Sequence, residues 1–314
     1  MTALHRHPRL QGGLALLYGG RSAERAISLQ SGAAVGAALE RLGLRVQAID
    51  TAGEGWLQRW PEGCRHAFIA LHGPGGEDGS VQGALQQLGV GHTGSGVLAS
   101  ALAMDKLRSK QLWRGLGLPT PDFVLAGADT DWAAVMADFG VAFVKPVREG
   151  SSIGMARVTT ATELEQAWGE AARYDSAVLV ERAVAGPEYT VAILGGDALP
   201  VIQVETERSF YDYQAKYHTD TTRYHCPSDL SAEAEAELQQ LALAAYRSLG
   251  CRDWGRVDVM AEADGAWQLL EVNTVPGMTD HSLVPMAARA AGLGFDELVA
   301  RILQHSLADG EGAP

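Results

Sequence analysis

Short apolar runs alternate with segments of helical periodicity over the first hundred residues. The predicted strands cover 14–18, 44–49 and 67–71. Between the first two runs, apolar residues three or four apart predict a helix over 22–42. Glycine-rich segments follow the first and third runs, at 19–20 and 72–79. This alternation predicts an α/β N-terminal domain with a parallel sheet, in which binding sites gather at the carboxyl ends of the strands.

The pattern changes after the proline-rich segment 118–121. Further strands are predicted at 123–125, 141–145, 155–158, 178–180 and 189–194, and helices at 129–139 and 160–172. Thr160 and Glu163 form a capping-box pattern at the start of the second of these helices. The remaining chain predicts a strand from Leu199, a helix over 231–249, a hairpin and a helix over 295–304. The expected fold is the N-terminal α/β domain followed by two α+β subdomains.

The hairpin places four polar side chains on one face. Its strands, 256–260 and 269–273, flank Asp264-Gly265, a dipeptide typical of two-residue turns. With that turn, Asp258 lies opposite Glu271 and Arg256 lies opposite Asn273, all on one face because side chains alternate. The other face carries the predicted core residues, Val257, Val259, Leu270 and Val272.

Two carboxylates directly opposite each other on paired strands repel. A divalent cation held by the oxygen atoms of Asp258 and Glu271 would remove this repulsion, so the hairpin predicts a metal site. The alternative is a solvated sheet face whose acids are tolerated by exposure or paired with Arg256.

Composition narrows the function classes. The chain has 314 residues, of which 46% are hydrophobic and 20% charged, as in soluble globular proteins, and its net charge of −13 disfavours nucleic acid and anionic membranes as partners. The three cysteines form no metal-binding or disulfide pattern. Neither a signal peptide nor a membrane span is predicted, so a cytoplasmic enzyme is expected.

Lysine is rare, with only four among the 25 basic residues: Lys106, Lys110, Lys145 and Lys216. Lys145 ends an apolar strand and begins the segment 145–154, whose glycines and serines can cradle a phosphate. The segment is not a Walker A motif, because the lysine precedes it. The alternative is a flexible turn between two strands.

Two further segments suggest chemistry. The aromatic, irregular segment 206–227 predicts a lid, and the alternative is a surface excursion packed on its tyrosines. Backbone N–H groups in 274–282 could stabilise an oxyanion, and the alternative is a plain strand-to-helix turn. Together, a phosphate loop with a lysine, a lid and a carboxylate hairpin indicate Mg-ATP chemistry outside the P-loop class.

Six motifs give the chain a family resemblance. They are GGRSAER (19–25), LHGPGGEDG (71–79), MDK (104–106), KPVREGSSIG (145–154), YDYQAKY (211–217) and EVNTVPGMT (271–279). In this order they resemble those of the D-alanine–D-alanine ligases of the ATP-grasp superfamily, and the resemblance covers residues 14–304.

The resemblance implies an activity and a domain organisation. Such ligases use ATP to phosphorylate the carboxylate of one D-alanine, and the amine of a second D-alanine then attacks the D-alanyl phosphate, which supplies a peptidoglycan precursor. A Rossmann-like domain with the first D-alanine site would cover 1–104, the central ATP-grasp subdomain 105–185, and the C-terminal subdomain, with lid and metal site, 186–314. A homodimer is expected.

The resemblance also assigns roles to residues. Nucleotide binding is implied for Lys106, Lys145, Ser152, Glu181, Glu188 and Lys216. D-alanine binding is implied for Glu24, His72, Ser282 and Leu283. Two Mg²⁺ ions, which Mn²⁺ can replace, are implied at Asp258, Glu271 and Asn273, with Glu271 bridging. Roles in closing the lid or stabilising the tetrahedral intermediate are implied for Glu24, Ser151, Tyr217, Arg256 and Gly277.

The alternative activity is that of a D-alanine–D-lactate ligase. Ligases of that kind lack the tyrosine that matches Tyr217, so its presence favours an amine nucleophile. A nucleotide-binding protein without catalysis is disfavoured by the intact set Lys145, Asp258, Glu271 and Asn273. Another ATP-grasp ligase is disfavoured by the lid and the Glu24 segment. Val275, where serine is common, and Ala183, where a bulky residue is common, depart from the family pattern.

Overall fold

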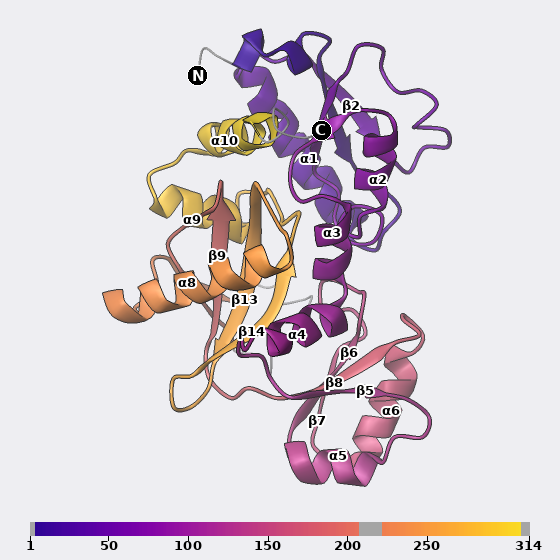
Figure 1. The fold of residues 1–314 in the computed structure, drawn as a ribbon, viewed down its shortest axis with the longest axis vertical. Helices are drawn as coiled ribbons and strands as arrows, with labels where there is room; N and C mark the ends of the chain where they lie inside the picture. The colour runs from indigo at the N-terminus through magenta and orange to yellow at the C-terminus, as the bar shows by residue number, and fades with distance from the viewer. Residues whose placement is uncertain (1–3, 207–221, 309–314) are drawn as a thin grey trace.

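The computed structural model describes residues 4–206 and 222–308, which form three sheets stacked along the long axis of the molecule (Figure 1). Two 3₁₀ helices, Leu4–Arg6 and Pro8–Leu10, lead into the first sheet. Its strands are β1 (Leu14–Tyr18), β2 (Val46–Asp50), β3 (His66–Ile69) and β4 (Gly91–His92), in the order β2-β1-β3-β4. All three pairings are parallel, which confirms the predicted α/β N-terminal domain.

Two helices connect strands of this first sheet. They are α1 (Arg25–Arg41), between β1 and β2, and α2 (Ser80–Gln87), between β3 and β4, while α3 (Val97–Met104) follows β4. The apolar side of α1 is buried on the sheet through Val35, Ala38 and Leu39, as its helical spacing predicts. Glu24 is therefore held at the N-terminus of α1, beside the carboxyl end of β1.

The second sheet is antiparallel. Its strands are β5 (Phe123–Ala126), β6 (Ala142–Pro146), β7 (Ala156–Val158) and β8 (Val178–Arg182), in the order β5-β8-β6-β7. The helices α5 (Trp132–Phe139) and α6 (Ala161–Ala171) cover one face, and the predicted capping box of Thr160 and Glu163 is present. The helix α4 (Lys106–Gly115), which the sequence analysis did not predict, leads into this sheet and packs against β14.

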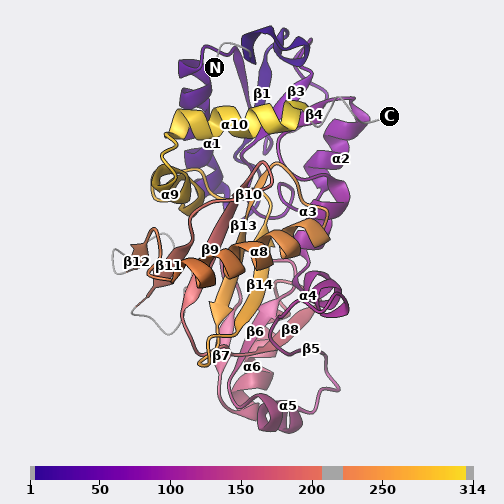
Figure 2. The same cartoon turned by 60° about the vertical axis from the view of Figure 1, so that its left-hand side comes forward.

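The third sheet is also antiparallel. Its strands are β9 (Glu188–Leu194), β10 (Asp197–Ala198), β11 (Ile202–Glu205), β12 (Arg223–His225), β13 (Trp254–Ala261) and β14 (Trp267–Asn273). The order is β12-β11-β9-β13-β14, and β10 pairs with β9. The helix α8 (Ala232–Ser248) crosses one face of this sheet (Figure 2), which leaves the other face to the second sheet.

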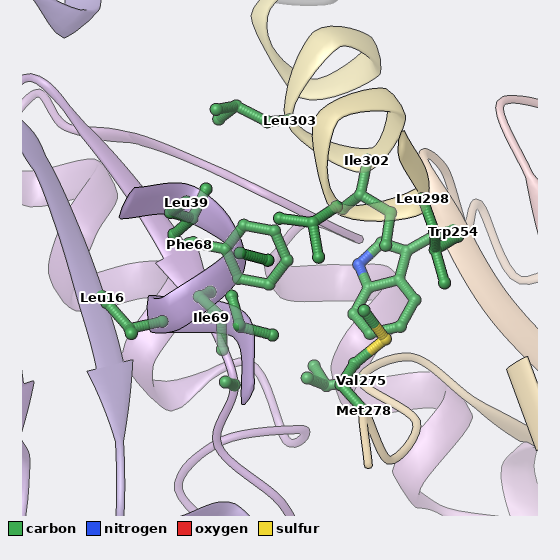
Figure 3. Close-up of a cluster of buried hydrophobic side chains, with 14 of the residues drawn as sticks. Leu16, Leu39, Phe68, Ile69, Trp254, Val275, Met278, Leu298, Ile302 and Leu303 are labelled. Atoms are coloured by element: carbon green, nitrogen blue, oxygen red, sulfur yellow. The ribbon is translucent and has the colours of Figure 1, made fainter. Parts of the chain in front are cut away.

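The last helices return to the N-terminal domain. They are α9 (Leu283–Ala290) and α10 (Phe295–Ala308), and α10 lies beside α1 in both views (Figures 1 and 2). Figure 3 shows how Leu298 and Ile302 of α10 and Trp254 of β13 meet Phe68 of β3 in one core. No helix in 4–206 or 222–308 is long and apolar enough to cross a membrane.

In the hairpin of β13 and β14, the polar residues pair as predicted, but the turn that joins the strands is not the predicted one. Asp258 is opposite Glu271 and Arg256 opposite Asn273, as predicted. The turn, however, has three residues, because Glu262 pairs with Ala266 and the Gly265 N–H donates to the Glu262 carbonyl. A β-bulge then shifts the register back, since Val259 is opposite Leu269. Leu270 is the extra residue.

The bulge changes which leucine enters the core. The prediction for Leu270 was wrong: Leu269 is fully buried in the core with Val257 and Val259, whereas Leu270 lines a pocket on the opposite face. The bulge thus presents Leu270 and Glu271 together to the second sheet.

Candidate active site

A pocket lies where the second and third sheets face each other. It is lined by Lys106, Phe143, Lys145, Ser152, Met155, Glu181, Val184, Glu188, Asp258, Met260, Leu270 and Glu271. The apolar members supply surface for a flat ring, and the charged members come from α4, β6, β8, β9, β13 and β14. A pocket with one apolar part and several convergent charges suits an amphipathic ligand such as a nucleotide.

Three buried charges form one network at the wall of the pocket. The Glu181 carboxylate lies 2.7 Å from the Lys145 ammonium through Oε1 and 2.7 Å from the Lys110 ammonium through Oε2. Burial lowers the pKa of Lys110 to about 8, and Glu181 opposes this. Burial also acts to raise the pKa of Glu181, but the two ammonium groups outweigh it and lower that pKa.

The two opposed carboxylates are neutralised by cations of the chain itself. Asp258 forms two hydrogen bonds with the Arg256 guanidinium, at 2.8 and 2.7 Å, and accepts further bonds from Thr190 Oγ1 at 2.7 Å and Asn273 Nδ2 at 3.0 Å. Glu271 lies 3.2 Å from Lys106 Nζ. The structure therefore has the Arg256 pairing that the sequence analysis gave as the alternative to a metal site.

The segment between β6 and β7 connects this pocket to the N-terminal domain. Ser151 Oγ donates to the buried Glu24 carboxylate, while Ser152 lines the pocket. Ser151 and Ser152 both have positive φ, at 50° and 59°, which non-glycine residues rarely adopt. At Gly150, a Cβ would lie 2.7 Å from Glu24 Oε2, so the lack of a side chain lets this segment approach Glu24 closely.

Behind Glu24, a buried network fixes the second glycine-rich segment to the chain after β14. His72 Nδ1 lies 2.8 Å from the Val275 carbonyl oxygen, and His72 Nε2 lies 2.9 Å from Ser31 Oγ. Glu77 accepts from the Gly73 N–H and the Val275 N–H. Burial, then repulsion from Glu24, raises the pKa of Glu77 to about 8.

Ser282 and Leu283 begin α9. Ser282 is the N-cap residue, and its Oγ accepts from the Thr279 N–H at 2.9 Å. A Cβ at Gly277 would lie 2.8 Å from Ser282 Oγ, so Gly277 and Ser282 are neighbours. The positive end of the α9 dipole and its first N–H groups suit a carboxylate at this position.

The structure thus groups the predicted residues around two adjoining regions. The pocket contains Lys106, Lys145, Ser152, Glu181, Glu188, Asp258 and Glu271. The Glu24 region contains Ser151 and His72, and Gly277, Ser282 and Leu283 lie at the start of α9. Lys216 and Tyr217 lie outside the described residues.

Three residues with contacts in these regions were not predicted: Glu77, Lys110 and Thr190. Lys110 had a signal in the sequence, because it is one of four lysines and follows Lys106 by four residues, one helical turn. Glu77 lies in the quoted motif LHGPGGEDG but carries no pattern that sets it apart.

A charged pocket between two antiparallel α+β sheets, with a carboxylate hairpin on one side, defines the ATP-grasp class. A family model described as "D-ala D-ala ligase C-terminus" matches residues 112–304. D-alanine–D-alanine ligases of Ectopseudomonas mendocina and Alcanivorax borkumensis are 56% and 55% identical to this chain, with 96% of each chain covered. The chain belongs to the D-alanine–D-alanine ligase family.

Solved structures agree. A D-alanine–D-alanine ligase of Bacillus anthracis complexed with ATP matches with a TM-score of 0.85 at 32% identity, covering 95% of this chain and 99% of that one. The VanG D-Ala:D-Ser ligase of Enterococcus faecalis matches with a TM-score of 0.82 at 30% identity, covering 93% and 98%.

Proposed function

We propose that this protein uses ATP to join two D-alanine molecules into D-alanyl-D-alanine for peptidoglycan synthesis. One observation carries the mechanism: the segment between β6 and β7 touches both regions of the site, with Ser151 on Glu24 and Ser152 in the pocket. A phosphate held by this segment is therefore next to an amino acid held by Glu24, as phosphoryl transfer between them requires.

In the nucleotide site, the apolar part of the pocket takes the adenine, and Glu181 and Glu188 lie beside the adenine and ribose. Lys106, Lys145 and Ser152 bind the phosphates, together with Lys216 of the lid. The positive charge of the lysines stabilises the charge that develops as the γ-phosphoryl group moves.

Asp258, Glu271 and Asn273 would hold two Mg²⁺ ions, and Glu271 would be the ligand shared by both. Their donor set suits this ion, because carboxylate and amide oxygens are the ligands it prefers. Phosphate oxygens of ATP would complete the coordination shell, because Mg²⁺ usually binds through one or two carboxylates together with substrate phosphates. When bound, the ions neutralise the β- and γ-phosphates. Arg256 and Lys106 hold the carboxylates before then.

In the amino-acid sites, Glu24 binds the ammonium group of the first D-alanine, near His72. The carboxylate oxygen of this first D-alanine attacks the γ-phosphorus of ATP, which forms D-alanyl phosphate and releases ADP. The second D-alanine binds through its carboxylate to Ser282 and Leu283 at the start of α9. Its amine then attacks the carbonyl carbon of the D-alanyl phosphate. Arg256 and the Gly277 N–H stabilise the tetrahedral intermediate, which expels phosphate. Ser151 and Tyr217 close the lid and exclude water.

Each of the three sheets belongs to a domain or subdomain with its own proposed role. Residues 1–104 bind the first D-alanine, 105–185 form the central ATP-grasp subdomain, and 186–314 supply the lid and metal ligands. A homodimer is part of this proposal, and the exposed apolar side chains Leu88, Val97 and Leu98 (46%, 39% and 73% exposed) are the candidates for its interface. The cytoplasm, where ATP is available, is the proposed compartment.

The test is a ligase assay with the purified protein, ATP and Mg²⁺. With D-alanine alone, we expect equal amounts of ADP and dipeptide. With D-alanine and D-lactate at neutral pH, we expect D-alanyl-D-alanine as the main product. A preference for D-lactate would contradict the amine nucleophile, and failure to release phosphate with D-alanine would contradict a ligase altogether.

A further inference from the structure

The fully buried Lys110 contacts both sheets that face the pocket. Its partners include Glu181 of β8 in the second sheet and Leu269 of β14 in the third sheet. Its side chain is 0% exposed, and three oxygen atoms surround Nζ: Glu181 Oε2 at 2.7 Å, Thr120 Oγ1 at 2.9 Å and the Leu269 carbonyl at 3.2 Å. An ammonium group has three protons and no acceptor, so this set of partners satisfies it. Lys106 and Lys145, by contrast, line the pocket itself.

One set of contacts leads to the β-bulge. Thr120 Oγ1 accepts from Lys110 and donates to the Leu269 carbonyl at 2.8 Å, and the Leu269 N–H donates to the Pro119 carbonyl at 3.0 Å. Leu269 is the residue at which the register shifts. The segment 119–120 and Lys110 therefore hold the bulge that directs Leu270 and Glu271 into the pocket.

The other contact controls the charge of Lys145. Two buried ammonium groups share the single carboxylate of Glu181, which leaves one net positive charge at the wall of the pocket. If Lys110 were neutral, Glu181 would cancel the charge of Lys145. Lys145 would then have to leave a buried carboxylate without a partner in order to bind a phosphate, which is costly.

We propose that Lys110 is a positioning residue for ATP. It neutralises Glu181 so that the charge of Lys145 is available to the nucleotide phosphates, and with Thr120 it fixes the bulge that presents Glu271. This inference rests on the proposed function for the identity of the nucleotide, but the network itself does not depend on the amino-acid substrate.

The test is a double-mutant cycle of Lys110→Met and Glu181→Gln, with ATP binding measured by calorimetry and kcat/KM measured separately for ATP and D-alanine. Lys110→Met should lower ATP affinity and kcat/KM for ATP by roughly 30- to 100-fold, as truncation of one partner of a buried charge pair does. The KM for D-alanine should stay within about threefold, because Glu24 and His72 are not part of this network.

The double variant separates positioning from a structural role. Removing the Glu181 charge returns the net charge to that of Lys145 alone, so Lys110→Met/Glu181→Gln should bind ATP about tenfold more tightly than Lys110→Met. An ATP affinity equal to the product of the two single effects would overturn the proposal. A Lys110→Met variant that binds ATP normally would overturn it too.

Trp113→Phe is the matched structural control. Trp113 is fully buried on the same helix and donates to the Ala245 carbonyl at 3.3 Å, away from Glu181. It should lower the melting temperature and leave ATP affinity unchanged, and an equal loss of affinity would mean that any damage to α4 has this effect. If Lys110→Met does not fold, Thr120→Val gives the test: it should weaken ATP binding about three- to tenfold, and unchanged binding would contradict the proposal.

Calorimetry also keeps the two proposals apart. A wild-type protein that binds ATP but forms no dipeptide would contradict the proposed function. The double-mutant cycle would still test the role of Lys110, because it measures ATP binding. A wild-type ligase whose Lys110→Met variant is unaffected would contradict this inference alone.

Discussion

At the scale of single residues, the polar groups of the hairpin could be predicted and their partners could not. The alternation of side chains places Asp258, Glu271 and Asn273 on one face, and the structure confirms this face. Lys106, which neutralises Glu271, is more than 160 residues away in the chain. Thr190, which donates to Asp258, comes from β9, whose place beside β13 was not predicted.

Glu271→Gln should nearly abolish dipeptide formation. The variant removes the charge that the proposed bridging role requires, and it leaves Lys106 without its carboxylate partner. We expect kcat to fall by about 10³-fold, as when a transition-state electrostatic contact is lost, measured by dipeptide release at saturating ATP. Glu165→Gln, at an exposed position on α6, is the control with no expected effect. Near-normal turnover in Glu271→Gln would rule out the bridging role.

At the scale of elements, the hairpin differs from the prediction in two ways whose effects on the strand register cancel. The three-residue turn alters the register by one residue, and the bulge at Leu270 alters it back. The pairing of Asp258 with Glu271 was therefore predicted correctly from an incorrect turn. The bulge could not be predicted from apolar pattern, since Leu269 and Leu270 are equally apolar and only packing against Val257 and Val259 selects one of them.

Gly265→Ala should destabilise the protein by about 1 kcal/mol. Gly265 has a φ of 88°, and a Cβ there would meet nothing within 4 Å, so the cost is that of the backbone conformation alone. Gly169→Ala should have the opposite sign and stabilise by about 0.5 kcal/mol, because Gly169 lies within α6 with open space around it. Urea denaturation measures both. Equal shifts in the same direction would refute the argument from φ.

At the scale of the whole molecule, distant parts of the chain complete the N-terminal domain. Phe68 of β3 packs on Trp254 of β13 with ring centroids 6.5 Å apart, and α10 covers the same core (Figure 3). His66 Nε2 of β3 lies 2.9 Å from Ser306 Oγ of α10, and both side chains are buried where this strand and helix meet. The site depends on this packing, because it fixes the segment after β14 beside Glu24.

The His66 contact predicts a loss of stability in acid. Burial, with smaller contributions from His92, Arg9, His7 and Arg252, lowers the pKa of His66 to about 3 in the folded protein, whereas the ordinary value is 6.5. The unfolded chain therefore binds the extra proton between pH 6.5 and 3, and stability falls as the pH falls through this range. From pH 7 to pH 4.5 this one group should remove about 2 kcal/mol of unfolding free energy.

Urea denaturation of the wild type and His66→Gln at both pH values measures this contribution. The variant should lose about 2 kcal/mol less than the wild type over the same interval, whatever its stability at pH 7. His281→Gln, at an exposed position, is the control and should match the wild type. An identical pH dependence in all three proteins would show that His66 is not the acid-sensitive group.

The sequence alone was enough to predict the N-terminal α/β domain, the two α+β subdomains and the polar face of the hairpin. It also contains the motifs by which the family was recognised. These depend on local periodicity, turn chemistry and residue type, which a linear chain records. Only the tertiary structure decided which leucine enters the core, that Arg256 and Lys106 neutralise the hairpin acids, and that Lys110 shares Glu181 with Lys145. These depend on contacts between distant segments in a nearly water-free interior, where each buried charge needs a partner whose position no local pattern specifies.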